Sequence, residues 1–201
     1  MLFRSLLAYE LGYRAQLSSK FTASVSTFYN QYDDVRSTSF TPVTILPLYF
    51  ANNLEGDTYG TEFSGDYQVS NDWSLHAGYT LLRENLRVKP GEYDLNGALN
   101  ETADPKHQVS LRSALTLPGR AEFDAALRWV DTLLTNDGSI PGTVPSYFEL
   151  NTRLAWHASD RLEISVVGQN LLHPYHVEYG FPDPTRVEIQ RSVYGKLAWR
   201  Y

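Results

Sequence analysis

The residue types best suited to binding a metal ion gather in one segment near the C-terminus. His173, His176 and Glu178 have a spacing that could hold a metal, because histidine is the commonest metal ligand among side chains. Two prolines, Pro174 and Pro182, mark this segment as a loop, where such side chains are more often simply solvated. We therefore predict no metal site here.

Aromatic side chains share this segment and indicate a different role. Together with the histidines, and with one tyrosine from a second long loop, they could contact a small ligand. The predicted ligand contacts are Tyr93, His173, Tyr175, His176, Tyr179 and Phe181. The alternative is that these side chains only pack the loops or anchor them at an interface.

Catalytic chemistry has weaker support in this sequence. It would need an Asp/His or Ser/His/Asn set within hydrogen-bond reach. His76 and His157 are the only histidines on the polar faces of predicted strands, and neither lies in a recognisable motif. We predict no catalytic residue and no cofactor.

Composition limits the class of protein without deciding it. The 201 residues are 42% hydrophobic and 20% charged, which would suit a soluble globule. No apolar run approaches the roughly 20 residues of a transmembrane helix, whereas membrane-spanning strands give a much weaker signal. The net charge of −6 argues against nucleic acid as a partner, and the lack of cysteine removes disulfides and thiolate metal sites.

Alternation of apolar and polar residues predicts an all-β chain of about nine antiparallel strands. The connections between them are alternately short and long, with long loops predicted at 33–47, 87–104, 132–144 and 171–185. The predicted strands cover residues 6–17, 21–30, 47–69, 73–81, 108–117, 122–129, 148–157, 162–169 and 186–201.

The two faces of these strands differ sharply in charge. Across the first eight strands the apolar face carries no charge, whereas the other face carries acids and arginines that include Glu62, Arg112, Arg128, Glu149, Arg153 and Glu163. A soluble Tyr-rich β-sandwich would also show this alternation. Many runs exceed ten residues, however, which is longer than sandwich strands and close to the 9–11 that cross a bilayer. Strand length therefore favours a transmembrane barrel, in which the fourteen tyrosines and four tryptophans would form interfacial girdles.

The last predicted strand resembles the closing strand of an outer-membrane β-barrel, whose terminal aromatic residue is read by the barrel-assembly machinery. The residues that match this assembly signal are Leu197, Trp199 and Tyr201. Arg191 is the one charge on the apolar face of this strand, and ten residues climb about 25 Å at the usual tilt, so we expect it at the outer headgroups.

Two short stretches extend the resemblance to one family. Gly168-Gln169-Asn170-Leu171-Leu172-His173-Pro174-Tyr175, followed by Arg191-Ser192-Val193-Tyr194-Gly195-Lys196, is similar to the TonB-dependent outer-membrane receptors. The resemblance implies a 22-stranded barrel filled by an N-terminal plug, with outer loops that contact ligand at the mouth. It also implies structural roles for Gly168, Asn170 and Leu171.

The odd strand count fits a part of such a barrel. If the last strand ends in the periplasm, the first of nine strands starts outside the cell, which a complete exported barrel with a periplasmic N-terminus cannot do. We therefore expect residues 1–201 to be the C-terminal portion of the barrel domain, without the plug and the first strands. The inward charges would then face the plug or pair with one another.

The resemblance implies a transport function in the bacterial outer membrane. We expect a non-enzymatic receptor segment for energy-coupled uptake of a scarce small ligand such as an iron-siderophore. Its expected partners are outer-membrane lipid, the barrel-assembly machinery, a small ligand such as a metal chelate, and TonB only through the missing plug. The alternatives are a small outer-membrane β-barrel hydrolase and the soluble β-sandwich binding module.

Overall fold

The chain folds as one large antiparallel sheet. The computed structural model describes residues 5–99, 102–136, 141–180 and 187–201. Nine strands pair in the order β1-β2-β3-β4-β5-β6-β9-β10-β13, which confirms the predicted count and the all-β class. Their bounds are β1 Ser5–Ser18, β2 Phe21–Ser39, β3 Tyr49–Ser70, β4 Trp73–Val88, β5 His107–Leu117, β6 Ala121–Val130, β9 Tyr147–His157, β10 Leu162–Gln169 and β13 Ser192–Trp199.

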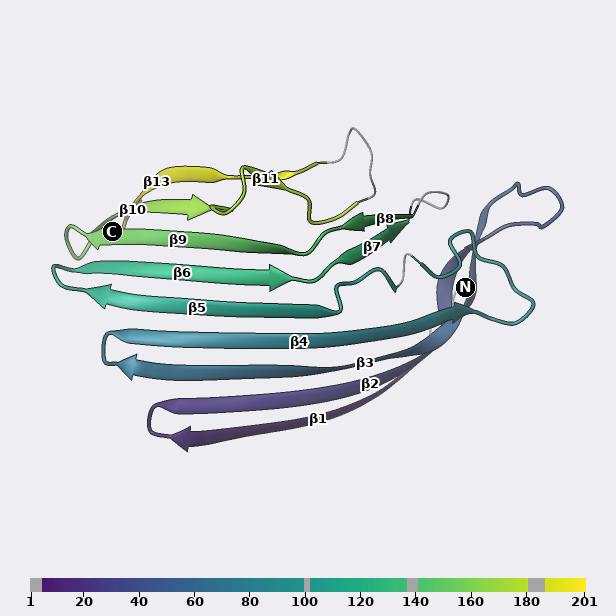
Figure 1. The fold of residues 1–201 in the computed structure, drawn as a ribbon, viewed down its shortest axis with the longest axis horizontal. Helices are drawn as coiled ribbons and strands as arrows, with labels where there is room; N and C mark the ends of the chain where they lie inside the picture. The colour runs from purple at the N-terminus through teal and green to yellow at the C-terminus, as the bar shows by residue number, and fades with distance from the viewer. Residues whose placement is uncertain (1–4, 100–101, 137–140, 181–186) are drawn as a thin grey trace.

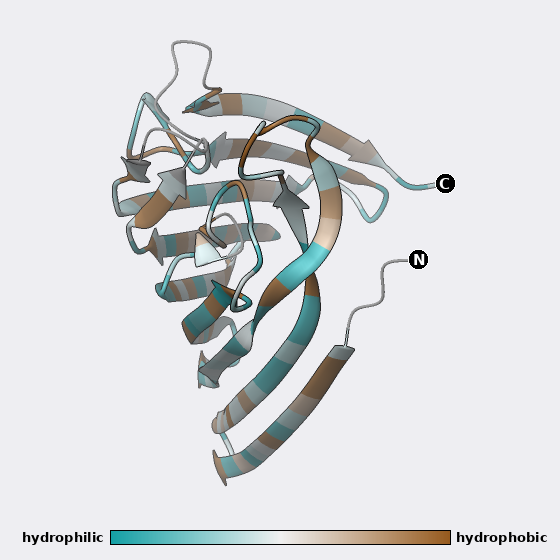
Figure 2. Cartoon of the chain, turned by 90° about the vertical axis from the view of Figure 1, so that its right-hand side faces the viewer, coloured by the Kyte–Doolittle hydropathy of each residue, from teal (hydrophilic) through white to brown (hydrophobic). Residues whose placement is uncertain are grey.

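The connections are short at one end of the sheet and long at the other (Figure 1). Figure 2 shows that the sheet is curved and that its strands alternate apolar and polar residues along their length. Among the described residues, no helix has the length and apolar character needed to cross a membrane.

The sheet is taller on one side than the sequence predicted. Residues 33–39 were expected in a polar loop, but β2 continues to Ser39, and β4 continues to Val88 instead of ending near residue 81. These extensions bury Val35 and Leu54 against Ala98 of the following loop, with Tyr32, Leu86 and Val88 packed around them. The small core offsets the cost of ordering a segment whose polar sequence suggested a loop.

Polar contacts fasten the long loop after β4 to this extension. The Asp94 carboxylate accepts hydrogen bonds from the backbone N–H groups of Thr38, at 2.8 Å, and of Ala98, at 3.1 Å. Lys89 donates to Asp34 at 2.6 Å and also pairs with Asp33, and both carboxylates raise the pKa of the Lys89 ammonium. The loop is therefore bound to the sheet at several points.

Two other loops contain short strands that the sequence did not indicate. The predicted loop 132–144 forms the hairpin of β7 Leu133–Asn136 and β8 Pro141–Val144. The closing strand was predicted from residue 186, but β13 begins at Ser192, and Ile189–Gln190 form β12, which pairs with β11 Tyr175–His176. Arg191 lies between β12 and β13, just beyond the ladder that β13 forms with β10.

Strand β3 is continuous, as the sequence predicted for the run around Tyr59-Gly60-Thr61-Glu62. Phe28, an aromatic residue on the otherwise polar face of β2, explains the glycine beside it. A Cβ on Gly60 would meet the Leu81 carbonyl oxygen at 2.2 Å and the Phe28 ring at 2.6 Å. The Leu81 carbonyl and the Phe28 ring therefore both require glycine at position 60.

The apolar face carries aromatic residues at two heights. Tyr9, Tyr29 and Tyr59 are paired in register across β1, β2 and β3, and Trp129 contacts Phe148 with ring centroids 6.4 Å apart. Near the short turns lies a second row that includes Phe21, Tyr67, Trp73, Phe123, Trp156 and Trp199. Two aromatic rows with exposed aliphatic side chains between them are the pattern of a transmembrane barrel at its two interfaces.

We predict that a cation is tolerated on one face of β5 and not on the other. Leu111 lies midway along β5 on the apolar face, so Leu111→Arg should cost roughly 2–4 kcal/mol of folding free energy in a bilayer. Ala114→Arg on the polar face is the matched control, since it faces Asp124 in the register of β5 and β6. Heat-modifiable folding of both variants in lipid vesicles measures the difference, and equal losses would contradict the face assignment.

Candidate functional site

The polar face of the sheet encloses the main cavity of the described residues. The cavity has a volume of about 650 Å³ and is lined from seven strands, β2 through β10. A hollow that so many neighbouring strands line must lie on the concave side of a curved sheet. The concave face is therefore the polar face that carries the charges predicted to point inward.

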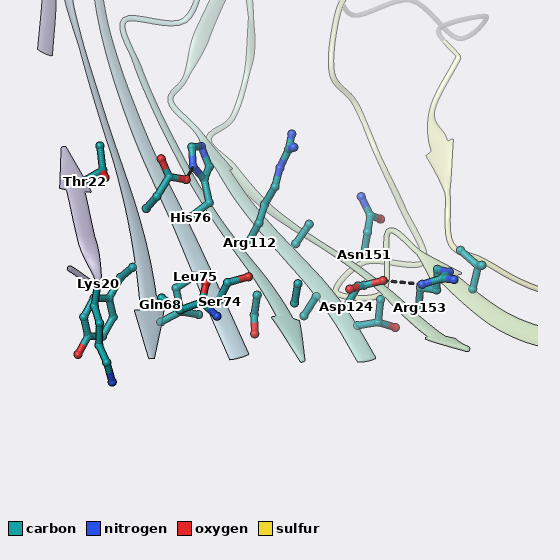
Figure 3. Close-up of a pocket in the computed structure, with 18 of the residues that line it drawn as sticks. Lys20, Thr22, Gln68, Ser74, Leu75, His76, Arg112, Asp124, Asn151 and Arg153 are labelled. Atoms are coloured by element: carbon teal, nitrogen blue, oxygen red, sulfur yellow. Dashed lines mark hydrogen bonds and ion pairs between the residues drawn. The ribbon is translucent and has the colours of Figure 1, made fainter. Parts of the chain in front are cut away.

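Arg153 organises the charges at one side of this cavity. Its Nη1 donates to Asp124 at 2.8 Å and to Glu122 at 3.0 Å, and its Nη2 donates to Glu163 at 2.8 Å (Figure 3 shows the bond to Asp124). His157 also contacts Glu122, at 3.0 Å. These side chains come from β6, β9 and β10, so the group ties three strands together and confirms the expectation that inward charges pair with their neighbours.

A histidine–carboxylate pair lies on the opposite side of the cavity. His76 Nδ1 is 2.8 Å from Asp66 Oδ1, so Asp66 can orient the imidazole. Within the described residues, no serine or threonine hydroxyl hydrogen-bonds to His76, and a hydrolase of the serine type would need one. The geometry gives no support to the hydrolase alternative.

Arg112 projects into the cavity between these two groups (Figure 3). Neither Arg112 nor Glu62, another predicted inward charge, forms an ion pair within the described part of the chain. Both side chains lie on the concave face by their register, Arg112 beside Ala126 and Glu62 beside Thr80. They are among the charges that a separate segment inside the barrel could neutralise.

A second arginine holds the last long loop against the wall of the sheet. Arg128 on β6 bonds to Glu149 on β9, and its Nη2 donates to Glu178 of the loop at 2.6 Å. His176 Nε2 contacts the same Glu178 oxygen at 3.0 Å, and the His176 ring lies 4.5 Å from that of Tyr147. The loop between β10 and β13 is therefore folded inward over the concave face.

The carboxylates around Arg128 have a spacing that suits a cation. Ligand atoms of Glu149, His176 and Glu178 all lie within 4.8 Å of one another. The guanidinium of Arg128 already donates to both carboxylates, so it neutralises the charge that would attract a metal ion. We interpret the group as a latch for the loop, here called the Arg128 latch, with members Arg128, Glu149, His176 and Glu178.

Asn170 fixes the point where this loop leaves β10. It is almost fully buried and has a positive φ of 51°. Its N–H donates to Asn151 Oδ1 and its side-chain amide donates to the Ile189 carbonyl, both at 2.9 Å. Leu171 packs on Gly168, where a Cβ would lie 2.9 Å from Leu171 Cδ2. These contacts are structural, as the resemblance implied for Gly168, Asn170 and Leu171.

The structure separates the predicted ligand contacts into different environments. Tyr175 and Tyr179 are 61% and 78% exposed, and Tyr93 is also exposed beside Phe40. His176 is buried in the Arg128 latch, and His173 is half-buried with its ring centroid 5.9 Å from that of His176. Phe181 lies outside the described residues. The exposed tyrosines are thus available to a ligand, whereas His176 is used within the protein.

Sequence reasoning identified the members of the latch but not their association. Arg128, Glu149 and Glu178 were recognised as two inward charges and one loop acid, and they are separated by as many as 50 residues in the chain. The register that places Arg128 beside Glu149 depends on the full β6–β9 pairing. The inward folding of the loop has no local pattern in the sequence that could reveal it.

We predict that loss of the latch loosens the loop without unfolding the sheet. Arg128→Met would leave Glu149, whose side chain is 14% exposed, without its cation and would release Glu178. Losing a hydrogen bond to a charged group should raise amide hydrogen exchange in residues 171–180 by about tenfold.

Arg120→Met is the control for this measurement. Arg120 pairs with Asp160 at the short turns, where the side chains are 54% and 92% exposed, so the pair contributes at most about 1 kcal/mol. Hydrogen exchange followed by mass spectrometry compares the two variants within the full-length protein. Unchanged exchange of residues 171–180 in Arg128→Met would show that the latch does not hold the loop.

Comparisons with known proteins agree with this architecture. Solved structures with similar folds include the FrpB iron transporter from Neisseria meningitidis, with a TM-score of 0.74 and 13% identity. The match covers 96% of this chain and 30% of the transporter. The ferric yersiniabactin uptake receptor FyuA from Yersinia pestis has a TM-score of 0.69 and 20% identity over 96% of this chain and 29% of its own. The ferric enterobactin receptor PfeA from Pseudomonas aeruginosa (G324V mutant) has a TM-score of 0.76 and 12% identity over 98% of this chain and 31% of its own.

These identities establish the fold alone, and the chain spans about 30% of the length of the structures it matches. No protein with a curated function matches it in sequence. The model of the TonB dependent receptor-like β-barrel matches residues 7–171, which is most of the chain. The chain belongs to the family of TonB-dependent receptors and forms part of their β-barrel.

Proposed function

We propose that this chain is the C-terminal barrel segment of an outer-membrane receptor for energy-coupled uptake of a scarce small ligand, such as an iron-siderophore. The observation that carries this proposal is that one sheet has an apolar convex face and a charged concave face. The convex face has aliphatic side chains between two aromatic rows, and the concave face has a charged cavity of about 650 Å³. A bacterial outer membrane provides hydrocarbon for the first face and an aqueous lumen for the second.

The loops and the similar structures support a metal chelate as the class of ligand. Tyr175 and Tyr179 are exposed on a loop that the Arg128 latch holds over the concave face. Tyr93 is exposed on the loop after β4. The three solved structures described above are named for iron or for ferric siderophores, which supports a metal chelate as the ligand class.

The remaining strands and the plug belong to the same proposal. In the described residues, β1 and β13 each pair on one side only. An unpaired edge in hydrocarbon costs several kcal/mol for each unsatisfied backbone group, so the sheet needs further strands to close. Coupling to TonB would run through the plug, which would pair with free inward charges such as Arg112. No enzymatic step is part of this function.

We predict that uptake requires the extended protein and the loop tyrosines. Cells that make only residues 1–201 should accumulate no iron chelate, whereas the extended receptor should accumulate its chelate in a TonB-dependent manner. Within the extended receptor, Tyr175→Ala combined with Tyr179→Ala should weaken ligand binding by about tenfold, because each substitution removes a ring that would stack on the ligand.

The control is Tyr194→Ala, which removes the same side chain from the concave face of β13, within the ladder that β13 forms with β10. Uptake of a radiolabelled chelate and its equilibrium binding affinity are measured for both variants. Motor-dependent uptake by residues 1–201 alone would refute the proposal that the chain is a segment. Unchanged ligand binding by the double variant would show that Tyr175 and Tyr179 do not contact the ligand.

We also predict that assembly depends on the terminal aromatic residue. Tyr201 follows β13 and is fully exposed, so it is free both to anchor at the inner interface and to be read by the barrel-assembly machinery. Tyr201→Ala should lower the outer-membrane yield several-fold, whereas Tyr194→Ala should leave it unchanged. Quantitative immunoblots of membrane fractions compare the two yields, and similar yields would show that Leu197, Trp199 and Tyr201 are not an assembly signal.

A further inference from the structure

The hairpin that joins β2 to β3 ends in a group of exposed aliphatic side chains. Val43 is 90% exposed and Leu46 is 67% exposed, and both Ile45 and Leu48 are exposed beside them. These four residues are here called the aliphatic tip. Residues 37–54 contain no charge, although 20% of the whole chain is charged. The hairpin therefore presents a neutral, apolar surface to water.

The turn of this hairpin does not need its aliphatic side chains for folding. Ile45 has a positive φ of 63°, a conformation that β-branched residues rarely adopt and that glycine or asparagine adopts easily. The turn is closed by backbone and hydroxyl groups instead, since the Ile45 N–H donates to the Thr41 carbonyl and the Thr44 hydroxyl donates to the Leu46 carbonyl, both at 2.7 Å. An isoleucine that is both strained and exposed indicates a role in binding.

The aliphatic tip lies outside the reach of membrane lipid. Tyr59 belongs to the aromatic row nearer the long loops, and Tyr49 at the start of β3 is ten residues further out, a climb of about 25 Å. The headgroup layer is only roughly 5–8 Å thick. Figure 1 shows the hairpin reaching beyond the ends of β5 and β6, and Figure 2 shows it arching across the front of the curved sheet. Whatever covers the tip must therefore come from the aqueous side.

The base of the hairpin is joined to a proposed ligand contact. The ring of Phe40 lies with its centroid 5.6 Å from that of Tyr93, which is exposed on the loop after β4. Asn53, a buried residue of β3, donates its side-chain amide to the Tyr93 carbonyl at 2.9 Å. The hairpin and the Tyr93 loop are thus held together, and the apolar surface of the aliphatic tip continues from the ring of Tyr93.

The size of the aliphatic tip limits what can bind to it. Four side chains are far fewer than the 20–30 residues that each partner contributes to a stable protein interface. They are enough to cover part of one hydrocarbon chain, in which each buried methylene raises affinity by about fourfold. A neutral aliphatic surface of this size is therefore better suited to the chain of a small amphiphilic molecule than to a second protein.

We propose that the ligand of this receptor is an amphiphilic metal chelate, and that the aliphatic tip binds its hydrocarbon chain. The metal-binding group would contact the exposed tyrosines, among them Tyr93, while the chain lies along Val43, Ile45, Leu46 and Leu48. This inference rests on the proposed uptake of a metal chelate. It deepens that proposal by naming the subclass of chelate, which carries an acyl chain, and the loop that selects it.

The test measures equilibrium binding of ferric chelates to the extended receptor in lipid nanodiscs. The probes are ferric hydroxamate, catecholate and carboxylate chelates, each in a plain form and in a form with a decanoyl chain. The wild type should bind the decanoyl form of the chelate it recognises about tenfold more tightly than the plain form. Ile45→Gly combined with Leu46→Ser should bring this ratio close to one and leave the affinity for the plain form unchanged. Glycine fits the positive φ at position 45, so the turn is retained.

The matched control is Leu134→Ser, which removes a leucine that is 61% exposed on β7, and it should keep the tenfold ratio. Partition of the decanoyl chain into the nanodisc lipid is the same for every variant, so differences in the ratio report the protein surface.

The outcomes separate this inference from the proposed function. Equal affinity for the plain and decanoyl forms in the wild type, an unchanged ratio in the double variant, or an equal loss in Leu134→Ser would each overturn the inference. A wild-type dimer in light scattering that the double variant abolishes would assign the aliphatic tip to a second copy instead. Binding of none of the chelates would refute the proposed function itself, whereas binding of a plain chelate without gain from the chain refutes only the inference.

Discussion

The fold depends on one constraint, which is that backbone N–H and C=O groups must be hydrogen-bonded wherever hydrocarbon surrounds them. In this chain the constraint is met by ladders that run without interruption through the region between the two aromatic rows. The β5–β6 ladder pairs every residue from Gln108 to Leu117, and the β6–β9 ladder pairs every residue from Ala121 to Val130. Register shifts occur only near the strand ends, in the β1–β2, β2–β3 and β3–β4 pairs.

The ladders also determine how charges are used. A paired strand must place alternate residues on the concave face, so arginines and acids on adjacent strands come within reach of one another at regular heights. Arg153 meets acids from both neighbouring strands, and Arg128 meets Glu149 directly across the β6–β9 pair. In a wet lumen such pairs add modest stability, but they fix the positions of side chains that would otherwise move freely. The Arg128 latch uses the same geometry to hold a loop.

The membrane constraint also explains how much the sequence could predict. Between the aromatic rows it demands strict alternation, and residues such as Leu111 and Arg112 therefore revealed the strand and its faces. Above the outer row the constraint ends, and polar stretches such as 33–39 can be strand or loop according to what packs on them. Leu54 and Ala98 supply that packing from distant positions, which no local pattern contains. The hairpin β7–β8 and the β11–β12 pair were missed for the same reason. Both lie in loops outside the membrane-spanning part of the sheet, where no alternation of apolar and polar residues is required.

Regions released from this constraint are the ones that can carry specific recognition. A residue on the convex face between the aromatic rows, such as Leu111, must be apolar in a transmembrane barrel, and several charges on the concave face, such as Arg153, are held by partners on neighbouring strands. Above the outer row the chain is free to place Tyr175 and Tyr179 towards solvent. A uniform barrel wall can therefore support different ligands in different receptors, because the residues that choose the ligand lie where folding requires least of them.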